Sequence, residues 1–275
     1  GQERRNSPNQ SKPTNSINPI STPFSMDLLS AFVSNQDVSY DATYSCYLSS
    51  TWSGDRHPIG YDAIQYLAHL SRPVLVSHSQ AFDLWHPYRF ASKGVEDVAE
   101  TGDTGTLEAW LKANDNIGFV ADVVVGEDQF NAFDSFQEFP PLHLSQDSPL
   151  ISTISKLDPS PDWFTGISGF SPICKDGFWY EIFTIATYPW DAGTKQGETY
   201  SYSSSDEPVQ HAITPLNVVR VPDSGILLDP AQTTVLPVAE WSCVLWPLEP
   251  GVDFTEWPSV SRVTEFPSMS ERDVT

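Results

Sequence analysis

Basic residues are scarce in this sequence. Lysine and arginine number 14 against 36 aspartates and glutamates, so the formal net charge is -22 at pH 7. Nucleic-acid backbones and anionic membranes both attract clustered lysine and arginine, and we therefore expect neither as a partner. A strongly acidic surface suits divalent cations, a saline medium or a basic partner, although the charge can also serve solubility alone.

Long apolar runs and targeting segments are missing as well. No stretch approaches the ~20 apolar residues that a membrane-spanning helix requires, so no membrane span is predicted. No leader is recognisable in the polar N-terminal sequence. We interpret Gly1 as the start of a processed chain, with a signal peptide already removed.

Cysteine is limited to Cys46, Cys174 and Cys243. Three cysteines at this spacing do not form a zinc cluster, and an odd number allows one disulfide and one remaining thiol. Cys46 and Cys243 fall on the first and last strands predicted for the domain. Because such strands often pair, a disulfide between them is one hypothesis, and a Cα separation above ~7 Å would exclude it. The alternative is that all three are buried and reduced.

Motifs of enzymatic chemistry are also absent. The histidines form no H-x-x-x-H or H-E-x-x-H pattern, there is no phosphate loop or C-x-x-C, and Gly-Ile-Ser-Gly at residues 166–169 lacks the frame of a nucleophile elbow. Acidic residues between positions 127 and 138 could form a general acid–base pair, but a solvated face is the preferred interpretation. We predict no catalytic residues and no enzymatic activity.

Turn-forming and strand-forming residues are abundant instead. The 23 prolines, 15 glycines and 12% aromatic residues favour a mostly β fold with many short strands. Strands are expected near residues 38–51, 72–77, 119–125, 142–157, 179–188, 217–221 and 235–246. Helices are predicted only at 94–100, which ends before Gly102, and at 106–113, where apolar residues have helical spacing.

The two ends of the chain differ from the central domain, which we assign to residues 38–247. Residues 1–37 are predicted to form a flexible polar arm with a glycosylation sequon at Asn9, in which residues 26–33 form a short helix or a docked apolar clip. Residues 248–275 are predicted to form an extended, proline-interrupted tail whose aromatic residues need a surface to cover them. Either end could reach a neighbouring subunit and support a homo- or hetero-oligomer.

Two short motifs place an aspartate beside a proline and an aromatic residue: Asp162 within PSPDWF (159–164) and Asp191 within YPWDAGT (188–194). Proline stiffens these loops and the aromatic residues anchor them. The aspartates are 29 residues apart, enough for one strand out and one back, so the loops are expected to meet. Two such carboxylates predict a hard-cation site, most plausibly for Ca²⁺. Alternatively, Asp162 caps a turn and Asp191 accepts N–H bonds from residues 192–194.

These two motifs also resemble the signature of the spondin domain family. Shorter fragments follow that family's order upstream: YSCYLSSTWS (44–53), HP (57–58), AHLS (68–71), SHS (77–79), LW (84–85), AS (91–92) and AETG (99–102). The resemblance covers roughly residues 42–247. It implies an antiparallel, C2-like β-sandwich with a Ca²⁺ ion bound through Asp162 and Asp191. We expect the predicted helical pair to cover one open end of this sandwich.

The resemblance also implies a glutamate on the strand before the first motif, but His143 stands at that position. Because two carboxylates are too few for Ca²⁺, a third side chain is expected from Glu138, Asp147 or Asp176. Backbone carbonyls and water would complete the ligand set.

The spondin resemblance implies a secreted, non-enzymatic module for adhesion or recognition in the extracellular matrix. Its partner would be an extracellular protein or glycan. We expect Trp163, Trp190 and Lys195 to contribute to the binding surface as exposed or rim residues. One alternative is a structural subunit that uses its terminal arms as staples in a larger assembly. A weaker alternative is a carbohydrate-binding module, because tryptophan and tyrosine are frequent.

Overall fold

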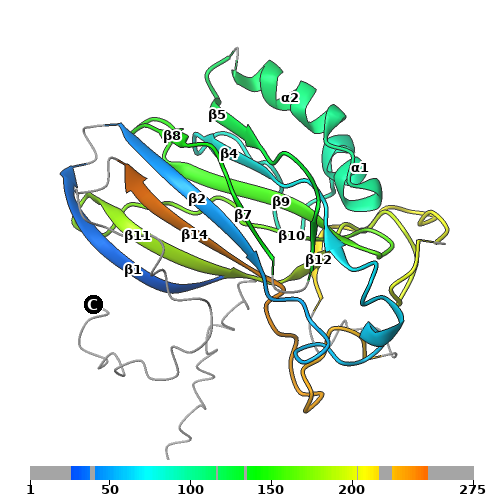
Figure 1. The fold of residues 1–275 in the computed structure, drawn as a ribbon. Helices are drawn as coiled ribbons and strands as arrows, with labels where there is room; N and C mark the ends of the chain where they lie inside the picture. Colours follow the sequence, from blue (N-terminus) through cyan, green and yellow to red (C-terminus); the bar gives the residue numbers. More distant parts are fainter. Residues whose placement is uncertain are drawn as a thin grey trace, which may run out of the picture.

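Two antiparallel β-sheets stack face to face, and a pair of helices covers part of the second sheet (Figure 1). The structure is a computed structural model that describes residues 26–37, 41–115, 117–132, 135–202, 204–216 and 225–246. The mostly β sandwich predicted from the sequence is confirmed. No helix within these described ranges has the length and apolar character needed to span a membrane.

The first sheet has the strand order β1-β11-β14-β2-β7, with β8 paired to β2. Its strands are β1 (Met26–Asp37), β2 (Ala42–Ser50), β7 (Phe136–Glu138), β8 (Leu142–Leu144), β11 (Phe178–Thr187) and β14 (Ala239–Trp246). Along β2, buried and half-buried residues alternate because successive side chains point to opposite faces of the sheet. One face of this sheet therefore supplies half of the sandwich core.

A disulfide joins two neighbouring strands of the first sheet. Cys46 on β2 lies directly opposite Cys243 on β14, with a Cα separation of 4.1 Å. The bond links residues 197 positions apart in the sequence, and Cys174 remains a free, half-buried thiol. The pairing follows from the adjacency of the first and last long strands of the central domain.

The second sheet runs β13-β12-β10-β9-β3-β6, and β4 joins β9 to β5. Its strands are β3 (His69–Leu70), β4 (Val74–His78), β5 (Val120–Val125), β6 (Phe130–Asn131), β9 (Leu150–Asp158), β10 (Trp163–Thr165), β12 (Pro189–Asp191) and β13 (Thr214–Pro215). A single 3-10 turn, η1 (Tyr61–Ala63), lies in the connection between β2 and β3.

Strands β4, β9 and β10 of the second sheet are buried on both faces. Leu75 and Trp163 face the core between the two sheets, whereas their sequence neighbours Val74, Val76 and Phe164 belong to a second apolar cluster shared with the helices. The period-2 alternation of a strand explains why consecutive residues enter different cores. The central strand β9 also buries the polar side chains of Ser152, Thr153, Ser155 and Lys156.

The helices α1 (Lys93–Thr101) and α2 (Gly105–Asp115) pack on that second cluster. The Ser92 side chain caps α1 at its start, and Gly102 ends it with a φ of 74°. Gly94 lets the helices approach, because a Cβ there would lie 2.8 Å from the Cα of Leu107. The pair thus covers a face of the second sheet, not an open end of the sandwich as expected, because both helices have an apolar side that this face buries.

The N-terminal prediction needs correction. The helix and the flexible arm are wrong for residues 26–37, whereas the docked segment agrees with the structure: these residues form β1, which pairs with β11 along the edge of the first sheet. The pairing of β1 with β11 contains register shifts, which break a simple period-2 pattern. The β1 sequence therefore shows no regular alternation of apolar and polar residues. The arm before residue 26, the strand predicted at 217–221 and the tail from residue 248 lie outside the described residues.

Candidate functional site

The two aspartate motifs meet at adjacent strands of the second sheet. Asp162 ends the turn between β9 and β10, and Asp191 is the last residue of β12. Because β10 and β12 are antiparallel neighbours, Trp163 pairs with Asp191, and the Ala192 N–H donates to the Asp162 carbonyl at 3.2 Å. Strand pairing therefore brings together two loops that are far apart in the sequence.

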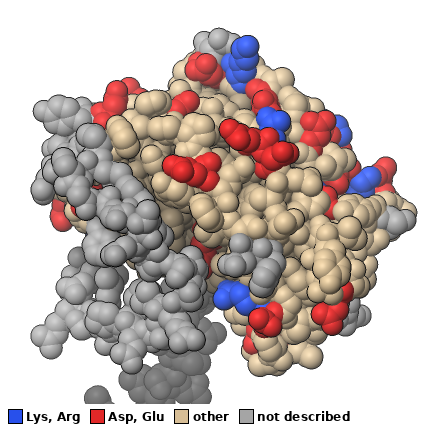
Figure 2. All heavy atoms as spheres, in the orientation of Figure 1, with Lys and Arg blue, Asp and Glu red and all other residues tan. Residues whose placement is uncertain are grey.

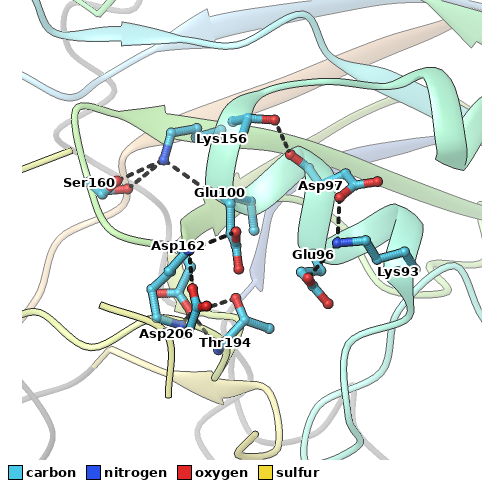
Figure 3. A network of polar contacts seen from close by, with 12 residues as sticks. Lys93, Glu96, Asp97, Glu100, Lys156, Ser160, Asp162, Thr194 and Asp206 are labelled. Atoms are coloured by element: carbon cyan, nitrogen blue, oxygen red, sulfur yellow. Dashed lines mark hydrogen bonds and ion pairs between the residues drawn. The ribbon is translucent and has the colours of Figure 1, made fainter. Parts of the chain in front are cut away.

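Asp162 is fully buried, and its two carboxylate oxygens differ. Oδ2 accepts hydrogen bonds from the backbone N–H groups of Thr194 at 2.7 Å and Lys195 at 2.9 Å, and from the Thr194 hydroxyl at 3.1 Å. Oδ1 is also buried but has no hydrogen-bond partner. Figure 3 shows the side chain pointing toward Thr194. Asp162 therefore ties its own turn to the loop after β12, with one oxygen left unsatisfied.

A buried lysine lies beside this turn. Lys156 of β9 has no exposed surface, and its Nζ donates to the carbonyl of Ala99 at 2.9 Å and to that of Ser160 at 2.8 Å (Figure 3). The Ala99 carbonyl is in the last turn of α1, where carbonyls lack helical partners. Lys156 therefore links the end of α1 to the motif turn.

Burial shifts the protonation equilibria of both charged groups. It raises the pKa of Asp162, although N–H donation from Lys195 and Thr194 and the charge of Lys156 act in the opposite direction. Burial also lowers the pKa of Lys156 to about 8, while the charges of Asp158, Asp162 and Glu100 partly counter that shift. Each group is thus held where its charge is costly, and each reduces the cost of the other.

Asp191 orders the second loop from within. Its Oδ1 accepts the N–H of Gly193 at 2.7 Å. Gly193 has a φ of 74°, and a Cβ there would lie 2.4 Å from the carbonyl oxygen of His211. Only glycine fits this position, which explains the Asp-Ala-Gly sequence of the motif. The Asp191 contact matches the alternative considered above, whereas Asp162 caps no turn of its own and accepts hydrogen bonds from Thr194 and Lys195 of the other loop.

The expected third metal ligands lie elsewhere. Glu138 is exposed on β7 of the first sheet, where the Tyr47 hydroxyl donates to it, and Asp147 and Asp176 are exposed. His143 lies on β8 and is hydrogen-bonded to Thr43. Across the described parts of the chain, no three His, Cys, Asp or Glu side chains are grouped as metal ligands would be.

The donor set therefore fits Ca²⁺ only in part. The unpaired Oδ1 of Asp162 is an oxygen that a cation would satisfy, and Asp191 is the cross-strand partner of Trp163, the residue that follows Asp162. Other ligands would have to be backbone carbonyls and water.

The predicted recognition residues need correction. Trp163 and Trp190 are only 0% and 2% exposed, so both are core residues and not rim residues. Each lies in a different apolar cluster, on opposite faces of the second sheet. Lys195 reaches the surface, but its ammonium pairs with Glu100 at 3.3 Å and with Asp206. The aromatic residues of the motifs hold the loops in place from beneath.

Other aromatic residues, which the sequence analysis did not select, are exposed next to the motif loops. Tyr88 and Phe90 lie on a segment that pairs with residues 212–213, and His211 donates its N–H to the carbonyl of Gly193. The density of aromatic residues at 82–90 is the signal in the sequence that points to this segment.

Two packed sheets with loops locked together at adjacent strand ends define a β-sandwich domain. The Spondin_N family profile matches residues 42–224, about two thirds of the sequence. The chain belongs to the Spondin_N family.

Known relatives agree with this assignment. Spondin-1 of Gallus gallus is 31% identical over 202 residues, which cover 72% of this chain and 25% of the relative, and Homo sapiens Spondin-1 is 30% identical over the same length. Spondin-2 of Rattus norvegicus is 31% identical over 167 residues, covering 58% of this chain and 48% of the relative. The chain thus spans about a quarter of Spondin-1 and about half of Spondin-2.

Proposed function

We propose that this chain is a non-enzymatic recognition or adhesion module that works in the extracellular matrix. Membership of the Spondin_N family supports this role. The Cys46–Cys243 disulfide supports an oxidising, extracellular location, because such bonds persist there and are rare in the cytosol. The observation that carries the proposal is the loop cluster, in which buried Asp162 fixes the loop after β12 to the motif turn.

Loops that are already rigid lose little conformational entropy when a partner binds. The loop cluster on this disulfide-linked sandwich can therefore present a preformed binding surface. The test is binding of the intact chain to a panel of immobilised collagens, fibronectin, laminins and matrix glycans. Saturable binding that is lost after heat denaturation would support a recognition module. Binding no stronger than that of the denatured chain across the whole panel would contradict it.

Tryptophan burial bears on the glycan-binding alternative. Trp52, Trp163, Trp179 and Trp241 are among the largest fully buried side chains, so they form the core and offer no sugar-stacking platform. Packing therefore explains these four tryptophans, whereas Trp246 is 53% exposed.

We also infer that Ca²⁺ binds at the motif loops, held by the carboxylates of Asp162 and Asp191 with backbone carbonyls and water. The unpaired, buried Oδ1 of Asp162 supports this assignment. The ion would supply positive charge that keeps both loops ordered. Because ligands that bind only the folded state stabilise it, Ca²⁺ should raise the melting temperature as its concentration increases.

Calorimetry and thermal melts with Ca²⁺ test this inference. Asp162→Asn and Asp191→Asn should each abolish both the binding heat and the shift in melting temperature. Asp147→Asn is the matched control, since this aspartate is exposed and lies outside the loop cluster. An unchanged melt of the natural chain, or an equal loss of binding in the control, would refute the assignment.

A further inference from the structure

Three large apolar side chains are exposed on two paired loop segments beside the motif loops. Tyr88 is 58% exposed, Phe90 66% and Val209 75%. We call these three residues the aromatic loop patch. Phe90 forms a β-bridge with Ala212, and the Gln210 side chain donates to the carbonyl of Ala91 at 3.0 Å. The two segments that carry the patch are therefore fixed side by side.

The backbone at Tyr88, one of the three patch residues, has an unfavourable conformation. Tyr88 has a φ of 65°, a left-handed value that bulky side chains rarely adopt. Two hydrogen bonds hold it: the Tyr88 N–H donates to the Ile213 carbonyl, and the Ile213 N–H donates to the Arg89 carbonyl, both at 2.8 Å. Such strain persists where the surrounding structure over-determines it, and it concentrates at functional surfaces.

The segment that carries Val209 is hydrogen-bonded to the loop after β12. The His211 N–H donates to the Gly193 carbonyl at 2.8 Å, and the Glu207 N–H donates to the Thr194 carbonyl at 2.9 Å. Thr194 is also a donor to Asp162. One continuous set of backbone hydrogen bonds thus runs from the buried aspartate to the segment that carries Val209.

Charges around the patch are mainly acidic. The charged side chains on these segments and their ion-pair partners are Asp83, Arg89, Glu100, Lys195, Asp206 and Glu207. The nearby cations are already engaged: Arg89 pairs with Asp83, and Lys195 with Glu100 and Asp206. Lys93, whose charge also acts on Asp206, pairs with Glu96 and Asp97. Acidic side chains are spread over the face drawn in Figure 2, with few basic ones among them. An approaching ligand therefore meets exposed apolar groups within a negative field.

We propose that the aromatic loop patch docks a basic segment of a partner protein in which lysine or arginine alternates with aromatic or aliphatic residues. This proposal rests on the recognition function proposed above and locates its binding surface. Apolar side chains of the partner would cover Tyr88, Phe90 and Val209, and its cations would meet the surplus carboxylates. Acidic or purely polar segments would be repelled or would gain no apolar contact.

The test uses the full chain and a labelled synthetic dodecamer in which arginine alternates with phenylalanine and serine. Two matched peptides replace every arginine by glutamate or every phenylalanine by serine. Binding is followed by fluorescence anisotropy at low and high NaCl. The informative variant is Phe90→Ser/Val209→Ser, which leaves the charge unchanged. Its matched control is Tyr66→Ser/Phe136→Ser, which removes two exposed apolar side chains elsewhere, 93% and 71% exposed.

We expect the patch variant to bind the basic aromatic peptide at least about tenfold more weakly, while the control variant stays within about twofold of the natural chain. Salt should weaken binding, because the attraction between exposed charges is screened. Equal affinity of the patch and control variants would overturn the proposal, as would equal binding of the basic and acidic peptides.

A further variant separates a partner from the chain's own basic N-terminal sequence. Arg4→Ser/Arg5→Ser/Lys12→Ser removes the basic charges of residues 1–25 in the full chain. Unchanged peptide affinity supports an external partner, whereas about tenfold tighter binding would show that the chain's own segment occupies the patch and would overturn the assignment. Peptide binding as expected with no binding to the matrix panel would refute the matrix role and leave the patch intact. The reverse result would refute only the patch.

Discussion

Lys156 provides a quantitative test of the buried polar network. Burial lowers its pKa from 10.5, the ordinary lysine value, to about 8. In the unfolded chain the amine keeps its ordinary value, so between these two pH values the unfolded state binds more protons than the folded state. Stability must therefore rise with pH across this window, because deprotonation removes a buried charge from the folded state.

The size of this effect follows from the difference in pKa. Each unit of difference corresponds to about 1.4 kcal/mol, so the full window is worth about 3 kcal/mol, of which about 2 kcal/mol falls between pH 8 and pH 10. Toward pH 10 a second ionisation changes the stability in the opposite direction. Burial also raises the pKa values of Tyr44, Tyr188 and Tyr200, so ionisation of these tyrosines in the unfolded state then lowers stability.

Urea unfolding at pH 8, 9 and 10, followed by tryptophan fluorescence, measures the effect. A Cys174→Ser background prevents thiol–disulfide exchange at alkaline pH. Over this range the chain that retains Lys156 should gain about 2 kcal/mol relative to Lys156→Met, because the tyrosines affect both chains equally. Parallel profiles for the two chains would refute the claim that Lys156 is a buried charge in the folded state.

The remaining predictions concern single positions in the loops and the core. Gly193→Ala should destabilise the fold by about 2–4 kcal/mol, because the new Cβ meets the His211 carbonyl; Gly118→Ala, at a similar φ of 77° with open space around it, should lose only about 1 kcal/mol in urea unfolding. His57 is buried and its pKa is lowered to about 4, so the folded state should lose stability as pH falls from 6.5 to 4. In the His57→Asn variant the melting temperature should depend less on pH across that range. Trp190→Ala should cost about 3–5 kcal/mol, because this side chain packs against Trp85 in the second core; a cost below about 1 kcal/mol would place it at the surface instead.

Local sequence could predict most of the strands and part of the site. Strands were predicted at 119–125 and 179–188 because β-branched and aromatic residues cluster there. The helices were predicted from the helical spacing of apolar residues and from Gly102. Strand separation also predicted that the loops of Asp162 and Asp191 would meet. The register shifts of β1 and the second face of the β9–β10 sheet could not be predicted, because both depend on what packs against each segment.

The aspartate motifs show where sequence alone reaches its limit. Their residue types determined two stiff, anchored loops with a carboxylate on each, since proline geometry and aromatic burial are local properties. Whether Trp163 and Trp190 face a partner or a core was decided only by tertiary structure, which places them on opposite, covered faces of one sheet. The burial of Lys156 was also decided only by tertiary structure, because the end of α1 lies over β9 and its Ala99 carbonyl accepts a hydrogen bond from the lysine. Exposure and burial are relations between distant segments, and no local pattern contains them.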